Sequence, residues 1–181
     1  MALRLPKFPR CRLVYVYVMY AVVLVLVSEE LFIPGLVIAA SGIALRIWSA
    51  GYIIKDNELA TGGPYSLCRH PLYLGTFIFG IGSVIASRIW WLIPVYAVGF
   101  AVFYIPSIVG EQRFLAAQFG EEYAEYCRRV PVFLPWRRGT GSGAFSISNA
   151  MRLREHLHAL ASFIFLALLA VLGHLRATHG L

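Results

Sequence analysis

The chain has 181 residues, of which 59% are hydrophobic and only 14% are charged, and its formal net charge at pH 7 is +7. Soluble domains are typically about 45–50% apolar and about 25% charged, so this composition excludes an ordinary soluble domain and favours a membrane protein. The length fits one compact bundle and leaves little room for a second domain.

Five apolar stretches are long enough, or nearly so, to cross a hydrocarbon core that needs about 20 residues of helix. They run over residues 12–28, 31–51, 71–87, 89–109 and 157–175. The first is short enough for a signal peptide, but no small-residue cleavage site follows it, so we expect a retained span. The predicted fold class is therefore all-α, an integral membrane helical bundle of about five transmembrane spans.

Basic residues are distributed unevenly around these spans. Four precede the first span, three surround the second loop and seven lie between the fourth and fifth spans, so 14 of the 16 share one side. Only Arg88 and Arg176 fall on the other side. By the positive-inside rule this predicts a cytoplasmic N-terminus and an outside C-terminus, in a bacterial inner membrane or, for a eukaryotic chain, the endoplasmic reticulum. Topology and anionic lipid account for the charge, so we expect no nucleic-acid partner.

Several residues are expected to interrupt or modify the first four spans and the loops between them. Arg46 lies four or five residues inside the second span, where it can extend to the interface or face a cavity, and the first interpretation is favoured. A helix breaker, Thr61-Gly62-Gly63-Pro64, interrupts the cytoplasmic segment 52–70. Pro71 opens the third span at a tolerated first-turn position. Pro106 predicts a kink in the fourth.

The C-terminal third has three predicted parts. Residues 111–130 read as an amphipathic helix at the cytoplasmic interface, broken at Gly120. The domain division that follows is a membrane core over 1–136, a flexible Gly/Ser-rich linker over 137–156 and an additional span in 157–181. The three cysteines, Cys11, Cys68 and Cys127, are widely separated and predict neither a disulfide framework nor a metal site.

Two cytoplasmic segments carry residues suited to a zwitterionic ligand. The helix N-terminus at Pro71 favours a carboxylate, and the ring faces of Tyr65 and Tyr73 suit a cation. Glu111 can accept hydrogen bonds from hydroxyl or ammonium groups. S-adenosylmethionine combines a positive centre, a carboxylate and a ribose. Each residue alone has an ordinary structural explanation, with His70 as a helix cap and Glu111 as the start of an interfacial helix, so the hypothesis depends on the joint arrangement.

The stretch from Gly62 to Gly75, GGPYSLCRHPLYLG, resembles the signature of the isoprenylcysteine carboxyl methyltransferase and phospholipid methyltransferase family. A second block, from Glu111 to Pro135, is similar to the closing pattern of that family. Together the blocks cover roughly residues 50–136. The resemblance implies an integral membrane methyltransferase that uses S-adenosylmethionine on a lipid-like or isoprenoid acceptor, at a carboxyl oxygen or an amine nitrogen. It implies no metal and assigns no catalytic residue. Its cofactor positions fall on Asn57, Glu58, Leu59, Ala60, Tyr65, His70, Pro71, Leu72, Tyr73 and Glu111.

Three features depart from the isoprenylcysteine enzymes. Ser107 stands where they carry an arginine, Gln112 stands where they often carry an acid, and the fifth span lies outside the matched blocks. Two alternatives therefore stay open. Sterol-type membrane reductases also contain an R-H-P-x-Y-x-G sequence and would bind NADPH instead. A non-enzymatic membrane protein could have kept the fold without the activity.

Overall fold

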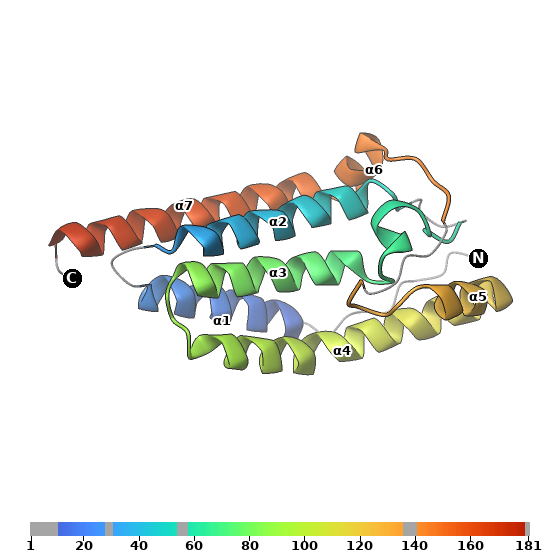
Figure 1. The fold of residues 1–181 in the computed structure, drawn as a ribbon, viewed down its shortest axis with the longest axis horizontal. Helices are drawn as coiled ribbons and strands as arrows, with labels where there is room; N and C mark the ends of the chain where they lie inside the picture. The colour runs from blue at the N-terminus through green and yellow to red at the C-terminus, as the bar shows by residue number, and fades with distance from the viewer. Residues whose placement is uncertain (1–10, 28–30, 54–57, 136–140, 180–181) are drawn as a thin grey trace.

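The computed structural model describes residues 11–27, 31–53, 58–135 and 141–179 (Figure 1). These residues form seven α-helices and one short 3₁₀-helix, and no strand occurs among them, so the all-α prediction is confirmed. The elements are α1 (Cys11–Leu26), α2 (Ile33–Ala50), η1 (Gly63–Ser66), α3 (Pro71–Ala86), α4 (Leu92–Phe119), α5 (Glu121–Arg129), α6 (Ile147–Arg152) and α7 (Glu155–His179).

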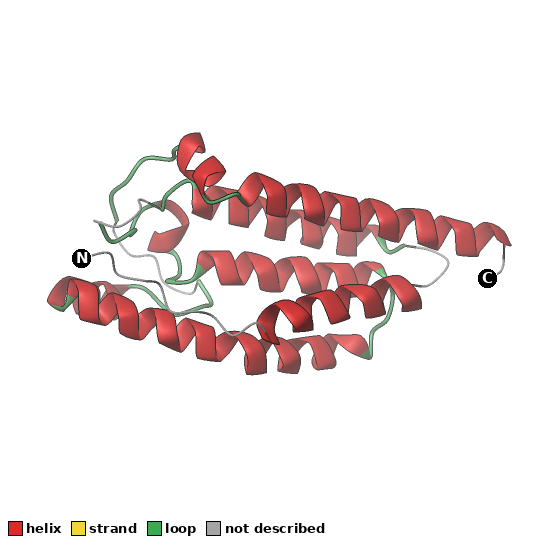
Figure 2. Ribbon diagram, turned by 180° about the vertical axis from the view of Figure 1, so that it is seen from behind, coloured by secondary structure: helices red, strands yellow, loops and turns green. Residues whose placement is uncertain are grey.

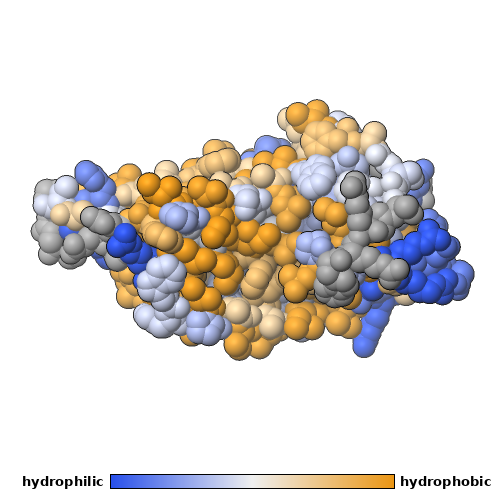
Figure 3. All heavy atoms as spheres, in the orientation of Figure 1, coloured by the Kyte–Doolittle hydropathy of each residue, from blue (hydrophilic) through white to orange (hydrophobic). Residues whose placement is uncertain are grey.

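The five predicted spans correspond to α1, α2, α3, α4 and α7, which run along the long axis of the molecule (Figures 1 and 2). Helices α2, α4 and α7 are long and apolar enough to cross a membrane, and α1 and α3 are shorter apolar helices. Apolar residues occupy the middle of the face in Figure 3, and hydrophilic residues gather towards both ends. This distribution is that of a membrane helical bundle.

Helices α2 and α3 pack closely because small residues line their shared face. A Cβ atom on Gly42 would lie 2.5 Å from the backbone nitrogen of Phe79 and 2.6 Å from the carbonyl oxygen of Gly75. Neither contact is possible for a real side chain, so only glycine allows this backbone approach. Gly35, Ala39 and Ala86 extend the same contact along the two helices. Small residues serve this purpose in membrane helices, where close van der Waals packing drives association.

Helix α4 differs from the sequence prediction at its C-terminal end. The fourth span was expected to stop at residue 109 and an interfacial helix to begin at 111, but α4 continues through Pro106 and Glu111 to Phe119. It ends at Gly120, whose φ of +53° favours glycine. Helix α5 then carries the amphipathic pattern alone, with charged residues exposed and Tyr123 and Tyr126 buried.

The segment after α5 is packed against the rest of the protein where the structure describes it. The backbone nitrogen of Ser146 donates to the carbonyl oxygen of Gly51 at 2.9 Å. Gly141 lies so close to Thr61 that a Cβ atom would collide with its carbonyl group. Helix α6 lies inside the predicted linker 137–156 and contacts both α2 and α7. This segment therefore brings the start of α7 back to the end of the bundle that carries η1 (Figure 1).

Candidate functional site

The loop before α3 is held in place by Arg69. Its Nε donates to the carbonyl oxygen of Val130 at 2.7 Å, and its Nη2 donates to that of Cys127 at 2.9 Å. These carbonyls belong to the C-terminal end of α5, where helices leave acceptors unsatisfied and favour a cation. The hydroxyl of Tyr126 donates to the carbonyl oxygen of Tyr65 at 2.8 Å. Helix α5 thus fixes the loop that carries the two motif residues Tyr65 and His70.

His70 immediately precedes α3, but its side chain does not cap the helix. Its Nε2 lies 3.2 Å from Nε2 of Gln112, and its Nδ1 lies 3.8 Å from Oε2 of Glu111. An amide NH₂ can only donate, so Nε2 accepts and the ring proton sits on Nδ1, facing the Glu111 carboxylate. Gln112 therefore sets the tautomer of His70, which gives a structural role to one of the three departures from the family pattern.

Burial controls the charge of His70. The residue is only 3% exposed, and burial, assisted by the nearby Arg69 charge, lowers its pKa to about 4. The Glu111 carboxylate acts in the opposite direction, but it is 34% exposed and 3.8 Å away, so burial prevails. The imidazole is therefore neutral at pH 7. Burial, and secondarily Glu111, raises the pKa of the Tyr65 phenol above its ordinary value, so this group also stays neutral.

A cavity of about 370 Å³ opens beside these residues. Small-molecule sites typically enclose roughly 300–1,000 Å³. Side chains from the loop before α3 and from helices α1, α2, α3, α4 and α7 surround the cavity. Its lining residues are Val16, Tyr17, Tyr20, Arg46, Tyr65, Arg69, His70, Leu72, Tyr73, Thr76, Phe79, Tyr104, Glu111, His158, Ala161 and Ser162.

Five of the predicted cofactor residues meet at this cavity: Tyr65, His70, Leu72, Tyr73 and Glu111. Pro71 is the buried first residue of α3 and does not line it. Residues 58–60 do not line the cavity. Glu58 is exposed, Ala60 is partly buried, and Leu59 packs against the α5 cluster of Tyr123, Tyr126 and Val130. Asn57 lies outside the described residues.

Arg46 faces the cavity, so the favoured prediction that it extends to the interface is wrong. Its Nη2 donates to both carboxylate oxygens of Glu155 in α7, at 2.7 and 3.0 Å. Its Nη1 donates to the hydroxyl of Thr76 and to the carbonyl oxygen of Leu72, the latter at 3.4 Å. A charge inside an apolar span requires such partners, and these lie on α3 and α7.

The sequence interpretation missed the contribution of α7. Glu155, His158 and Ser162 have the spacing i, i+3 and i+7, which places them on one face of a helix that is otherwise mostly apolar. This polar stripe could have been recognised in the sequence as a sign that the helix faces a polar site. The structure brings His158 and Ser162 to the cavity and pairs Glu155 with Arg46.

Ser107 lies one turn from both Tyr104 and Glu111 on α4. It is 3% exposed, and its hydroxyl has no hydrogen-bond partner among the described residues. Buried hydroxyls normally have a partner, so this one is an unusual polar atom on the helix between two residues that line the cavity. Elsewhere in the described ranges, no group of three His, Cys, Asp or Glu side chains is arranged to hold a metal ion.

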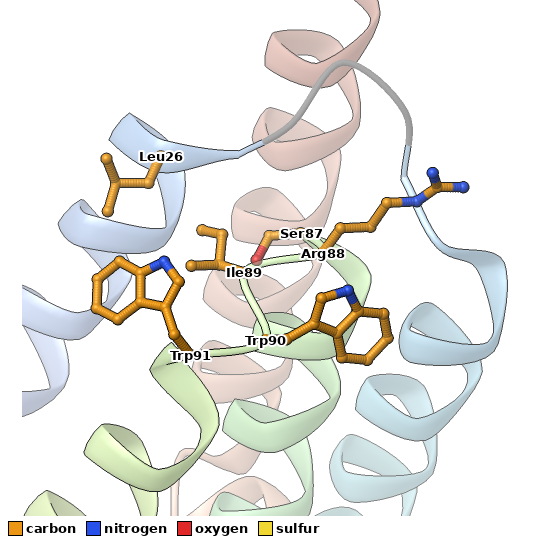
Figure 4. A pocket seen from close by; sticks show the side chains of 6 residues that line it. All are labelled: Leu26, Ser87, Arg88, Ile89, Trp90 and Trp91. Atoms are coloured by element: carbon orange, nitrogen blue, oxygen red, sulfur yellow. The ribbon is translucent and has the colours of Figure 1, made fainter.

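A larger cavity of about 480 Å³ lies at the opposite end of the bundle, around the turn between α3 and α4 (Figure 4). Leu26, Ser87, Arg88, Ile89, Trp90 and Trp91 line it. The two indole rings are mostly exposed, and tryptophan is common where spans meet the membrane interface. Its lining holds no carboxylate and no imidazole, so the smaller cavity is the better candidate for chemistry.

Comparison with known proteins identifies the family of this chain. Residues 19–122 match the phospholipid methyltransferase family. The cobalt-zinc-cadmium resistance protein CzcN of Cupriavidus metallidurans is 43% identical over 133 residues, which cover 70% of this chain and 60% of that protein. The nickel-cobalt-cadmium resistance protein NccN of Alcaligenes xylosoxydans xylosoxydans is 38% identical over 60% of this chain and 52% of its own length.

Proteins named as methyltransferases match between 45% and 60% of this chain. Protein-S-isoprenylcysteine O-methyltransferase of Rattus norvegicus is 38% identical over 48% of this chain and 31% of its own length. The chain thus spans less than two thirds of the length of each of these relatives, and no solved structure matches it. The family match covers more than half of the chain and includes every residue of the first motif and Glu111. The chain therefore belongs to the phospholipid methyltransferase family.

Proposed function

We propose that this protein is an S-adenosylmethionine-dependent methyltransferase that acts on a lipid-like or isoprenoid acceptor at the cytoplasmic side of a membrane. The observation that carries the proposal is the cavity where Tyr65, His70, Tyr73 and Glu111 meet. They come from two segments about 40 residues apart, and both segments belong to the family match.

The residues at this cavity suit the proposed methyl donor. The Glu111 carboxylate is an acceptor for ammonium or ribose hydroxyl groups, and the ring faces of Tyr65 and Tyr73 favour a sulfonium charge. His70 is neutral and presents Nδ1–H beside Glu111, so it adds no positive charge to repel a cationic donor. The N-terminus of α3 carries the positive end of the helix dipole, which favours the donor carboxylate.

Bound S-adenosylmethionine would supply an electrophilic methyl group, which passes in one displacement to the acceptor while the carbon–sulfur bond breaks. The protein's contribution is to hold the two reactants in line and to exclude water. A carboxylate acceptor needs no base, whereas an amine must first lose a proton. We assign no catalytic base.

The expected orientation places this cavity near the cytoplasm. The loop before α3, α5 and the start of α7 share one end of the bundle. The turn between α3 and α4 and the C-terminal end of α7 lie at the other end (Figure 1), and these segments contain Arg88 and Arg176. The positive-inside rule favours the first end as cytoplasmic. A soluble methyl donor would then reach the cavity directly.

Calorimetry in detergent tests the donor. S-adenosylhomocysteine should bind, and NADPH should not, because the sterol-reductase alternative requires the reverse result. Transfer of radiolabelled methyl groups from S-adenosylmethionine into a lipid extract of the host then tests the activity. Binding of neither ligand, with no transfer, would favour a non-enzymatic protein.

A second role follows from the resistance proteins, to which this chain is 38–43% identical. We propose that methylation by this protein supports tolerance of divalent metals such as cobalt, zinc and cadmium. Deletion of its gene should lower tolerance, and the wild-type chain should restore it. Restoration by the His70→Ala variant to the same level would separate tolerance from methyl transfer.

A further inference from the structure

Helix α7 lies outside the residues that match the family, which end at 122. It nevertheless lines the candidate cavity with His158, Ala161 and Ser162. These residues have the spacing i, i+3 and i+4, so they form one face of the helix. A helix that the family signature does not include thus forms part of the wall around the proposed active site.

Contacts along its whole length hold α7 in this position. At one end Glu155 pairs with Arg46 of α2. In the middle the Phe165 ring packs on Tyr20 of α1, with a centroid distance of 4.5 Å. At the other end Arg176 donates to the carbonyl oxygens of Val25 and Val27, at 2.8 and 2.6 Å. Helix α7 is therefore an integral wall of the bundle.

Exposed lining residues on α1 and α7 bring the cavity to the surface of the bundle at these two helices. Tyr17 on α1 lines it and is 68% exposed, and Ala161 on α7 lines it and is also exposed. The contact between Tyr20 and Phe165 closes the space further along the two helices. Because α1 and α7 are both apolar helices, a cavity that reaches the surface beside them faces the hydrocarbon region of a membrane.

The lining of the cavity combines polar and apolar residues. Arg46, Thr76 and His158 provide polar atoms, whereas Tyr20, Phe79 and Ala161 provide an apolar surface. Glu155 neutralises Arg46, so the polar part offers hydrogen bonds without an uncompensated cation. An amphiphilic molecule with a hydrogen-bonding end and an apolar body matches this surface.

We propose that α7 forms one wall of the methyl-acceptor site, and that a lipid-like acceptor enters between α1 and α7 with its polar end at Arg46 and His158. The inference rests on the proposed methyltransferase function. Helix α7 then selects the methyl acceptor, while the loop before α3 and Glu111 bind the methyl donor.

Photo-crosslinking tests the acceptor site without knowledge of the acceptor. p-Benzoylphenylalanine is introduced at Ala161 and, as a matched control, at Leu160, which is 56% exposed and does not line the cavity. Each protein is irradiated in membranes of its native host and analysed by intact mass spectrometry. We expect the adducts at position 161 to be enriched in one lipid class relative to the bulk profile at position 160. Identical lipid profiles at both positions would overturn the proposal.

A second measurement separates this inference from the proposed function. Ala161→Trp places a large side chain on the cavity lining and should lower methyl transfer into the host lipid extract by at least roughly tenfold, because it obstructs the acceptor site. The same variant should bind S-adenosylhomocysteine with unchanged affinity, and Leu160→Trp should match wild type in both assays. Undiminished transfer by Ala161→Trp refutes the α7 wall, whereas failure of wild type to bind S-adenosylhomocysteine refutes the methyltransferase.

Discussion

Arg46 in the second helix and Glu155 in the last form a two-pronged contact, in which one guanidinium nitrogen donates to both carboxylate oxygens at 2.7 and 3.0 Å. The residues are 109 positions apart, and both side chains are mostly buried. Removing one partner of a buried pair leaves the other charge uncompensated, which costs more than the pair itself contributes.

Glu155→Ala should therefore lower the free energy of unfolding by roughly 3 kcal/mol. Chemical denaturation in detergent measures this change. The double variant Arg46→Met with Glu155→Leu should recover most of the loss, because it leaves no buried charge. Glu125→Gln, which removes the exposed partner of Arg129, should change the stability by less than about 0.5 kcal/mol and serves as the control.

Three substitutions at the cavity should weaken donor binding. His70→Ala, Tyr73→Ala and Glu111→Ala should each reduce affinity for S-adenosylhomocysteine about tenfold or more, since a hydrogen bond to a charged group contributes roughly 1.5–3 kcal/mol. Isothermal titration calorimetry gives the affinity, and circular dichroism verifies folding. Glu121→Ala, at an exposed position on α5, is the matched control. Wild-type affinity in all three variants would exclude the assigned donor site.

The low pKa of His70 predicts a pH-dependent stability. Its pKa is about 4 in the folded protein and 6.5 ordinarily, so the unfolded chain binds the proton more readily between these values. The neutral imidazole therefore contributes to the free energy of unfolding. This contribution is fully present above pH 6.5 and decreases by at most about 3 kcal/mol as the pH falls towards 4. Denaturation at a series of pH values measures the slope, with His70→Gln as the non-titrating reference.

Gln112→Glu provides an internal check on that slope. A carboxylate at this position would lie beside Nε2 of His70 and should raise the imidazole pKa by roughly 1–3 units. The loss of stability between pH 6.5 and 4 should therefore become smaller. An unchanged slope would show that His70 does not control it.

The two ends of the bundle should label from opposite sides of the membrane. Cysteine at Trp91, in the turn before α4, should react with an impermeant maleimide from outside, and cysteine at Glu122 should react only after permeabilisation. Both positions are exposed, and the native cysteines are replaced first. Labelling of both from the same side would contradict the five-span topology.

Ser107 predicts a preference among acceptors. An arginine pairs with a carboxylate through charge-assisted and often bidentate hydrogen bonds, and a serine cannot reproduce them. Methylation of N-acetyl-farnesylcysteine should therefore be slow relative to the best lipid of the host extract. Equal rates for the two acceptors would show that Ser107 does not limit carboxylate recognition.

Local sequence patterns predicted much of this protein. The five apolar stretches located the helices that form the bundle. A membrane span must satisfy its backbone hydrogen bonds internally, so it is a long apolar helix that can be recognised in the sequence. The motif around His70 and the block that begins at Glu111 predicted residues that do meet at the cavity. Even so, the boundary between the fourth span and α5 was misplaced, since residues 111–119 continue a helix that Pro106 does not end.

The pairings between distant segments were decided only by the tertiary structure. Arg46 faces the cavity and not the interface because the fold places the carboxylate of Glu155 beside it. No local sequence pattern predicts this contact, since the two residues are far apart in the chain. The same holds for His70, whose neutral state follows from burial and from the nearby Arg69 charge. It also holds for α7, because only the folded structure brings His158 and Ser162 of its polar stripe to the cavity. Sequence determines which segments can enter a membrane, whereas the charge state and the partners of each polar group depend on the side chains that packing brings around it.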